Sequence, residues 1–150
     1  MTENPKAFYL AEKEKYESKL TEVKKNLRAI AVGRLSVFVF AIFGVYYFLG
    51  TTPVMLFFAI VGAVVFSFLL AEHWKLSSLK KDLELLIAIN ETELKVLAGE
   101  YFHLDAGDEF LNPKHHYSFD IDLFGKGSFF QYTNRTKTLA GRLALVKILT

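Results

Sequence analysis

The sequence predicts a mainly α-helical protein: a transmembrane helical hairpin, extended by a cytoplasmic antiparallel coiled coil and followed by a small mixed segment with a short strand and a truncated helix. Two apolar blocks contain no charged residue, and the charged segments that flank them carry apolar stripes at helical spacing. The composition changes after Gly99. The predicted boundaries are 1–34 for the first cytoplasmic helix, 35–71 for the hairpin, 72–99 for the second helix and 100–150 for the mixed segment.

The two apolar blocks run from Leu35 to Leu49 and from Val54 to Ala71, joined by a turn at 50–53. A bilayer core of about 30 Å needs about 20 apolar helical residues, so the second block fits, and the first fits if its helix continues into the turn. A buried hairpin in a soluble core is the alternative, but the complete lack of charges opposes it. A signal peptide is also disfavoured, because a long charged segment precedes the first block.

Basic residues on both flanks predict the orientation of this hairpin. The turn has no charge, so the positive-inside rule places both termini in the cytoplasm and predicts two spans of a plasma membrane. The flanking basic residues are Lys24, Lys25, Arg28, Arg34, Lys75, Lys80 and Lys81. No ionisable residue lies within either block, which argues against a transporter or ion channel. A net charge of +2 is too small to indicate nucleic-acid binding by itself, and the absence of cysteine excludes disulfides.

Apolar stripes before and after the blocks predict the coiled coil. The first consists of Tyr9, Tyr16, Leu20, Val23, Leu27 and Ile30, and the second of Leu76, Leu79, Leu83 and Leu86, continued by Leu94 and Leu97 after a polar break at Asn90. These stripes are able to pair within one chain or between the chains of a homodimer. The tight turn favours pairing within the chain.

Small residues recur at four-residue steps along the second block. They are Ala59, Ala63, Ser67 and Ala71, and the first block offers Ser36, Ala41 and Gly44. Small side chains on one face allow close approach of two helices in lipid, so these residues are predicted to pack the helices together. Ordinary membrane composition explains them equally well.

The mixed segment contains local signals for its elements. Gly99 is expected to end the second long helix as a left-handed cap. The alternation of apolar and polar residues over 117–123 predicts a half-buried strand, broken by Gly125–Gly127. Thr138 is expected to cap a last helix over 139–149. That helix is still apolar where the sequence stops, so a longer protein is expected.

Three groups of polar residues are candidate sites of chemistry. A metal cluster would use His103, Asp105, Asp108, His115 and His116, but their spacing matches no compact metal motif. Asp120 and Asp122 would share one face of the predicted strand, where a solvated face is the simpler interpretation. Arg135, Lys137 and Arg142 form a basic group that would contact phosphates or have an intramolecular role. The sequence therefore assigns no catalytic, cofactor or metal residue.

A set of residues near the C-terminus resembles the MutS mismatch-repair ATPase family, at the entry to that family's helical core. The matching residues are Gly127, Ser128, Asn134, Arg135, Thr136, Thr138, Gly141, Arg142 and Leu143. The run from His115 to Gly125 is similar to a membrane-attached bacterial branch of the family. The resemblance implies a structural role for these residues and a location in the bacterial inner membrane. The chain departs from the family at Lys147 and Ile148, where a tryptophan is common.

The resemblance implies that this chain is a non-enzymatic, membrane-anchoring N-terminal region of a MutS-like ATPase. ATP, magnesium and DNA would then be bound only by a region downstream of Thr150. The chain itself lacks a phosphate loop: before Gly125-Lys126 the first glycine is replaced by Asp120, and Gly127 stands where Ser or Thr is required. The alternative is a small membrane scaffold that recruits a partner through its cytoplasmic coiled coil.

Overall fold

A computed structural model describes residues 4–112, 117–118 and 120–150 of the chain. The fold is mainly helical, at 76% of residues, which confirms the predicted class. The chain divides into two compact units, Met1–Glu91 and Thr92–Thr150.

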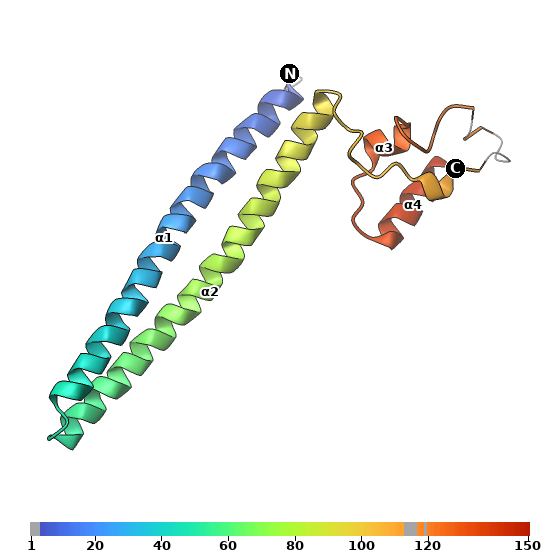
Figure 1. The fold of residues 1–150 in the computed structure, drawn as a ribbon. Helices are drawn as coiled ribbons and strands as arrows, with labels where there is room; N and C mark the ends of the chain where they lie inside the picture. Colours follow the sequence, from blue (N-terminus) through green and yellow to red (C-terminus); the bar gives the residue numbers. More distant parts are fainter. Residues whose placement is uncertain (1–3, 113–116, 119) are drawn as a thin grey trace. The chain divides into compact units, whose positions relative to one another are not determined.

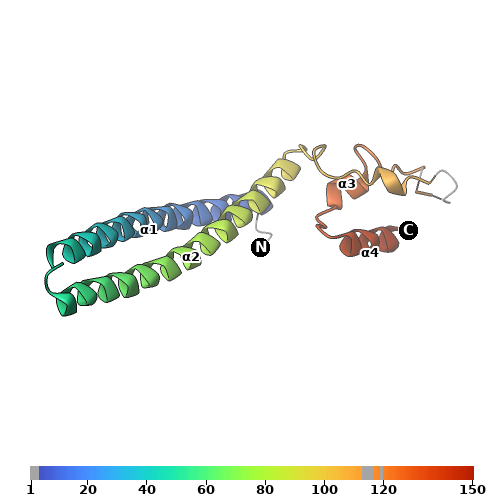
Figure 2. The same cartoon turned by 60° about the horizontal axis from the view of Figure 1, so that its bottom comes forward.

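The first unit is built on two long helices, α1 (Pro5–Tyr47) and α2 (Thr52–Leu97), which run antiparallel and side by side (Figures 1 and 2). The 43 residues of α1 correspond to a helix about 65 Å long. The Asn4 side chain accepts a hydrogen bond from the Lys6 backbone N–H at 3.1 Å, and Pro5 occupies the first turn, where its missing N–H costs nothing. Local capping chemistry therefore fixes where α1 begins.

The connection between the helices lies two residues earlier in the chain than the sequence predicts, and it has the predicted length of four residues. Thr52 and Pro53 belong to the first turn of α2, where a proline is well tolerated, so the connecting residues are Phe48–Thr51. The Phe48 backbone N–H donates to the Gly44 carbonyl at 3.1 Å, and the Thr51 N–H donates to the Phe48 carbonyl at 2.9 Å. These bonds satisfy part of the backbone that a helix end leaves without partners.

The charged halves of α1 and α2 pack through an apolar seam. Its buried residues are Leu20, Val23 and Leu83, with Tyr16, Leu27, Leu76 and Ile87 packed against them. The two predicted stripes thus meet within one chain. Leu79 and Leu86 do not join the seam and are exposed, whereas Asn90, expected as a break, is buried. The Asn90 amide donates to the Leu86 carbonyl at 2.8 Å, which satisfies it within α2.

Gly99 closes α2 as predicted. Its φ of 85° is left-handed, and the Glu100 N–H bonds to the Lys95 carbonyl while the Gly99 N–H bonds to the Val96 carbonyl, both at 2.9 Å. This pair of bonds is the Schellman arrangement, which glycine adopts at the smallest steric cost.

The second unit contains three short helices, η1 (Asp108–Phe110), α3 (Phe129–Thr133) and α4 (Leu139–Leu149). Its core consists of Leu123, Phe124 and Phe130, with Phe110, Leu145, Val146 and Leu149 packed against it. The helix α4 has the predicted bounds, and Thr138 caps it by accepting the Gly141 N–H at 3.1 Å.

The predicted strand over 117–123 is wrong. The structure has turns there, and no strand occurs in the part of the chain that it describes; Phe119 lies outside that part. The Ile121 N–H donates to the Tyr117 carbonyl at 3.2 Å, and the Leu123 N–H donates to the Ser118 carbonyl at 3.0 Å. These bonds between residues four and five apart are typical of turns. Alternating polarity specifies a strand only where a neighbouring strand completes the hydrogen bonds.

Candidate membrane interface

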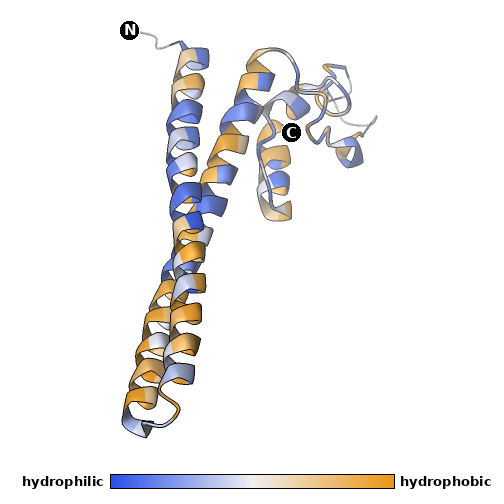
Figure 3. Cartoon of the chain, turned by 60° about the vertical axis from the view of Figure 1, so that its left-hand side comes forward, coloured by the Kyte–Doolittle hydropathy of each residue, from blue (hydrophilic) through white to orange (hydrophobic). Residues whose placement is uncertain are grey.

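Most residues in the half of the hairpin nearest the turn are hydrophobic (Figure 3). In the most apolar stretch of each helix, only 6% of the residues in α1 and none in α2 are buried. Among the exposed side chains, Phe40 and Tyr46 are more than 70% accessible. Soluble monomers rarely expose apolar patches beyond a few hundred Å². By their length and composition, both helices are able to cross a membrane.

Glycines allow close contact of the two helices inside this apolar half. A Cβ atom at Gly44 would lie 2.6 Å from the Phe58 ring, and one at Gly62 would lie 2.7 Å from the Ala41 Cβ. Both distances are too short for real side chains, so glycine is required at these positions as the helices now pack. Ala41 and Gly44 were candidates from the sequence, whereas Gly62 was missed although it is the single glycine of the second block.

The small-residue stripe predicted on α2 lies on an exposed face of that helix. Its four residues, Ala59, Ala63, Ser67 and Ala71, are all exposed. The Ser67 hydroxyl donates to the Ala63 carbonyl at 2.8 Å, so it is satisfied within its own helix. Spacing alone showed that these residues share a face of α2, but it did not show which face α1 covers.

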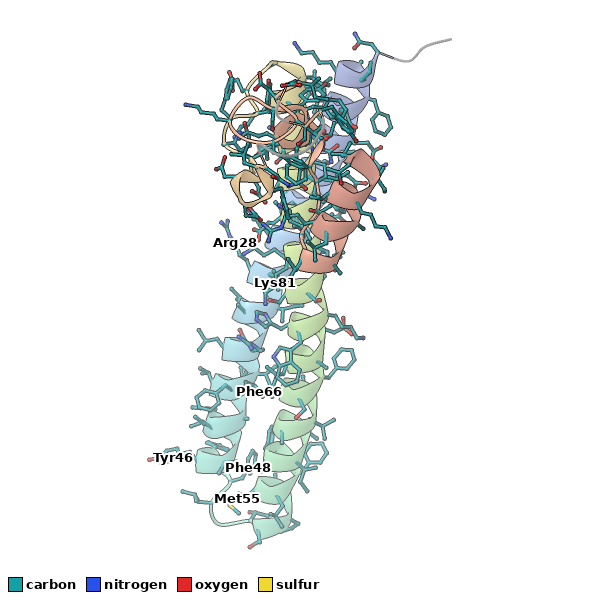
Figure 4. All side chains as sticks on the ribbon, turned by 90° about the vertical axis from the view of Figure 1, so that its right-hand side faces the viewer. Arg28, Tyr46, Phe48, Met55, Phe66 and Lys81 are labelled. Carbon is teal, nitrogen blue, oxygen red and sulfur yellow. The ribbon has the colours of Figure 1, made fainter. Side chains whose placement is uncertain are left out.

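Basic side chains border the apolar half at its end away from the turn, where Figure 4 shows Arg28 and Lys81. We call this group the basic collar; it consists of Lys24, Lys25, Arg28, Arg34, Lys75, Lys80 and Lys81. Lys75 pairs with Glu72 at 2.8 Å, and Lys80 approaches Glu84 to 3.7 Å. The other five make no ion pair with any residue that the structure describes. A band of unpaired positive charge is thus available to solvent or to anions.

Farther from the apolar half, an ion pair links the two helices of the seam. The Lys13 ammonium lies 2.9 Å from the Glu91 carboxylate across the two helices and 3.7 Å from Glu17 on its own helix. The hydrogen bond to Glu91 raises the pKa of Lys13 above its usual value. These side chains are partly exposed, so the pair fixes helix register more than it adds stability.

In the second unit, Gln131 is a buried polar hub that the sequence analysis did not identify. Its amide nitrogen donates to the carbonyls of Leu104 at 2.6 Å and Phe102 at 3.2 Å, and its side-chain oxygen accepts the Gly127 N–H at 2.8 Å. Every polar group of the side chain is therefore engaged. This hub ties the segment that follows α2 to the start of α3. No local pattern identifies it, because two of its three partners are 27 and 29 residues away.

Phe130, beside this hub, is completely buried. Its ring centroid lies 5.3 Å from that of Phe124 and 5.9 Å from that of Phe110. Gly107 approaches the same ring so closely that a Cβ would lie 2.7 Å from it, and its φ of 69° is left-handed. Backbone conformation and packing therefore both require glycine at position 107.

The residues of the family-like motif form caps, turns and ion pairs. Ser128 caps α3 by accepting the Gln131 N–H at 3.1 Å. Buried Asn134 accepts hydrogen bonds from the N–H and hydroxyl of Thr136 at 3.0 and 2.7 Å. Together with Thr138 at the start of α4, these side chains hold the chain between two helices. Leu143, in contrast, is 48% exposed.

Two of the three candidate phosphate-binding cations are engaged within the second unit. Arg135 contacts both carboxylate oxygens of Glu93, at 2.6 and 3.2 Å. Arg142 lies 2.9 Å from Asp105 and 3.1 Å from Glu109. The pKa of Asp105 is lowered, first by the hydrogen bond from its neighbour Gly107 and then by the one from Arg142. Both arginines therefore have intramolecular partners.

The remaining polar candidates do not form a site. Among the described residues, no three His, Asp or Glu side chains are arranged to hold a metal ion. His115 and His116 lie outside the described part of the chain. Asp120 and Asp122 are both exposed in turns, and Asp122 has a left-handed φ of 48°, so the single strand face expected to present them is not formed.

Comparisons with protein-family models, with curated proteins and with solved structures found no match to this chain. The strongest candidate for function is therefore the feature that the geometry supplies by itself. That feature is an exposed apolar half of a helical hairpin, bordered by the basic collar.

Proposed function

We propose that this chain is a membrane anchor, in which the apolar halves of α1 and α2 span a bilayer and hold the second unit at its surface. The observation that carries the proposal is the near-complete exposure of two long apolar helix segments. In water, so large an apolar surface would be left unburied, whereas hydrocarbon solvates it and both helices satisfy their own backbone hydrogen bonds.

The charge distribution supports an orientation with both termini in the cytoplasm. The basic collar lies at one end of the apolar half, and the connection Phe48–Thr51 at the other end has no charged residue. Short loops rich in Lys and Arg are retained on the cytoplasmic side. The second unit, which follows α2, would then also be cytoplasmic, and a bacterial inner membrane is the location we propose.

Extraction from membranes tests the anchor. The chain is expressed in bacteria, and the membranes are washed with alkaline carbonate and, separately, with high salt. We expect the protein to stay in the pellet after both washes and to be released by detergent, because two spans are effectively irreversible anchors. Recovery of the folded chain as a soluble species without detergent would show that the apolar half is covered in another way.

We further propose that the anchored region is the start of a MutS-like ATPase, and this part rests on the residues between Gly127 and Leu143. Their geometry supports a structural role: Ser128 and Thr138 cap helices, and Asn134 organises the turn between them. The test is the coding sequence beyond Thr150. A downstream phosphate-loop motif would support this assignment, and a stop codon directly after Thr150 would refute it while leaving the anchor intact.

A second candidate function is a membrane scaffold that binds a partner along its cytoplasmic helices. Apolar side chains outside the seam favour it, because Phe8, Leu85 and Ile89 are 51%, 61% and 48% exposed. Cross-linking in intact cells separates the two functions. A specific adduct to a second protein through residues near Leu85 is expected of a scaffold, whereas an anchor alone gives none.

A further inference from the structure

A groove on the hairpin joins an unpaired cation to the apolar half. Its volume is about 400 Å³, and it is lined by Ala31, Arg34, Leu35 and Phe38 from α1 and by Phe66 from α2. The residues of α1 are spaced three and four apart and so share one face of that helix. Figure 4 shows Phe66 in the apolar half of α2. Arg34 is thus the single charged residue in the lining of the groove, and the other lining residues are apolar.

Arg34 lies deeper than the other members of the basic collar. A Cβ at its neighbour Gly33 would lie 3.8 Å from a methyl carbon of Leu69, which places Arg34 level with the last turn of the charge-free block of α2. The first charge of α2 after that block is Glu72. Arg34 therefore lies about 5 Å, or one helical turn, inside the end of the apolar surface.

The charge of Arg34 has no partner within the part of the chain that the structure describes. The Arg34 guanidinium makes no hydrogen bond or ion pair with any residue in the described ranges, and the nearby Glu72 is paired with Lys75 at 2.8 Å. A charged side chain in the outer part of a bilayer extends toward the headgroups and binds there. The anion present at that level of every membrane is the phosphate of a phospholipid.

We propose that this groove binds one anionic phospholipid, with its phosphate on Arg34 and an acyl chain against Leu35, Phe38 and Phe66. Arginine suits this ligand because its planar fork donates two parallel hydrogen bonds to phosphate oxygens. The aromatic rings supply the apolar surface that an acyl chain needs. The inference rests on the proposed membrane anchor and adds a lipid class and a defined position on the hairpin.

The amount of lipid that stays bound to the full chain measures this binding. The protein is purified in a mild non-ionic detergent, mixed with phosphatidylglycerol or phosphatidylcholine, and examined by native mass spectrometry. We expect one phosphatidylglycerol to be retained in preference to phosphatidylcholine. Arg34→Gln should weaken that retention about tenfold, because a charge-assisted, bidentate contact is lost. Arg34→Lys should retain the lipid at an intermediate level, and Phe66→Ala should weaken the retention of both lipids.

Arg28→Gln is the matched control. It removes the same charge from the same helix, but Arg28 is exposed and does not line the groove. We expect its retention of phosphatidylglycerol to stay within about twofold of the wild type, since only diffuse attraction is lost. Two results would overturn the site. One is an equal loss of phosphatidylglycerol retention in the two Gln variants. The other is unchanged retention in Arg34→Gln when circular dichroism shows that its helix content is intact. Displacement of the lipid by millimolar inorganic phosphate would overturn it too.

The same samples separate this site from the anchor. If the wild type resists carbonate extraction but does not discriminate between the two lipids, the lipid site is wrong and the anchor stands. If the wild type is released by carbonate, the anchor fails first, and the lipid site fails with it.

Discussion

Replacing Phe130 by alanine should strongly destabilise the second unit, because this side chain is its packing centre. Phe130 is fully buried between Phe110 and Phe124, and Gly107 closes over its ring. Removal of a buried phenylalanine costs about 3–5 kcal/mol. A unit the size of Thr92–Thr150 has a total stability of about 3–9 kcal/mol by the usual rate per residue. The substitution therefore removes at least about a third of that stability, and all of it if the unit lies at the low end of this range.

Hydrogen exchange measured by mass spectrometry on the full chain in detergent reports this loss locally. We expect the amides of α4 in Phe130→Ala to exchange at least about a hundredfold faster than in the wild type. The seam between α1 and α2 should keep its protection, because it belongs to the other unit.

Phe129→Ala is the control, since it makes the same chemical change one residue earlier in α3. Phe129 is 54% exposed, so its replacement should cost less than about 1 kcal/mol and change exchange only a few-fold. Equal effects of the two substitutions, or an unchanged α4 in Phe130→Ala, would show that the second unit is not organised around this ring.

Two further predictions concern the helix contact and the pH dependence. Gly62→Val should lower the free energy of unfolding of the hairpin in detergent by about 1–3 kcal/mol, because the added Cβ would collide with Ala41. Ala63→Val, on the exposed face of α2, should leave this free energy unchanged. Acidification should loosen the second unit. The pKa of Asp105 is lowered in the folded unit, so the ionised carboxylate stabilises the fold. This stabilisation is fully present above about pH 4 and is lost as the pH falls through the lowered pKa. In Asp105→Asn, near-ultraviolet circular dichroism should show a weaker dependence on pH in this range.

Helix ends and helix existence were predictable because their causes are local. Pro5 and Gly99 mark the ends of the long helices through backbone geometry that neighbouring residues determine. Thr138 identified the start of α4 in the same way. The apolar stripes around Leu20 and Leu83 predicted the seam because a helix with one apolar face must cover it.

Features that depend on distant partners were not predictable. The alternation over 117–123 has no partner strand, so the chain forms turns there. The stripe of Ala59 and Ala63 was placed correctly on one face, but the contact with α1 uses Gly62 instead. Gln131 gave no signal, because its hydrogen-bond partners become neighbours only in the folded unit.

The central claim, a membrane hairpin with both termini in the cytoplasm, is tested most directly by thiol labelling in intact cells. The chain has no cysteine, so Ser18→Cys and Thr51→Cys each introduce a single reporter at an exposed position. We expect a membrane-impermeant thiol reagent added outside the cells to label Thr51→Cys alone, and Ser18→Cys to react only after the membrane is opened. Labelling of Ser18→Cys in intact cells without labelling of Thr51→Cys would reverse the orientation. Recovery of both variants in the soluble fraction would contradict the membrane anchor itself.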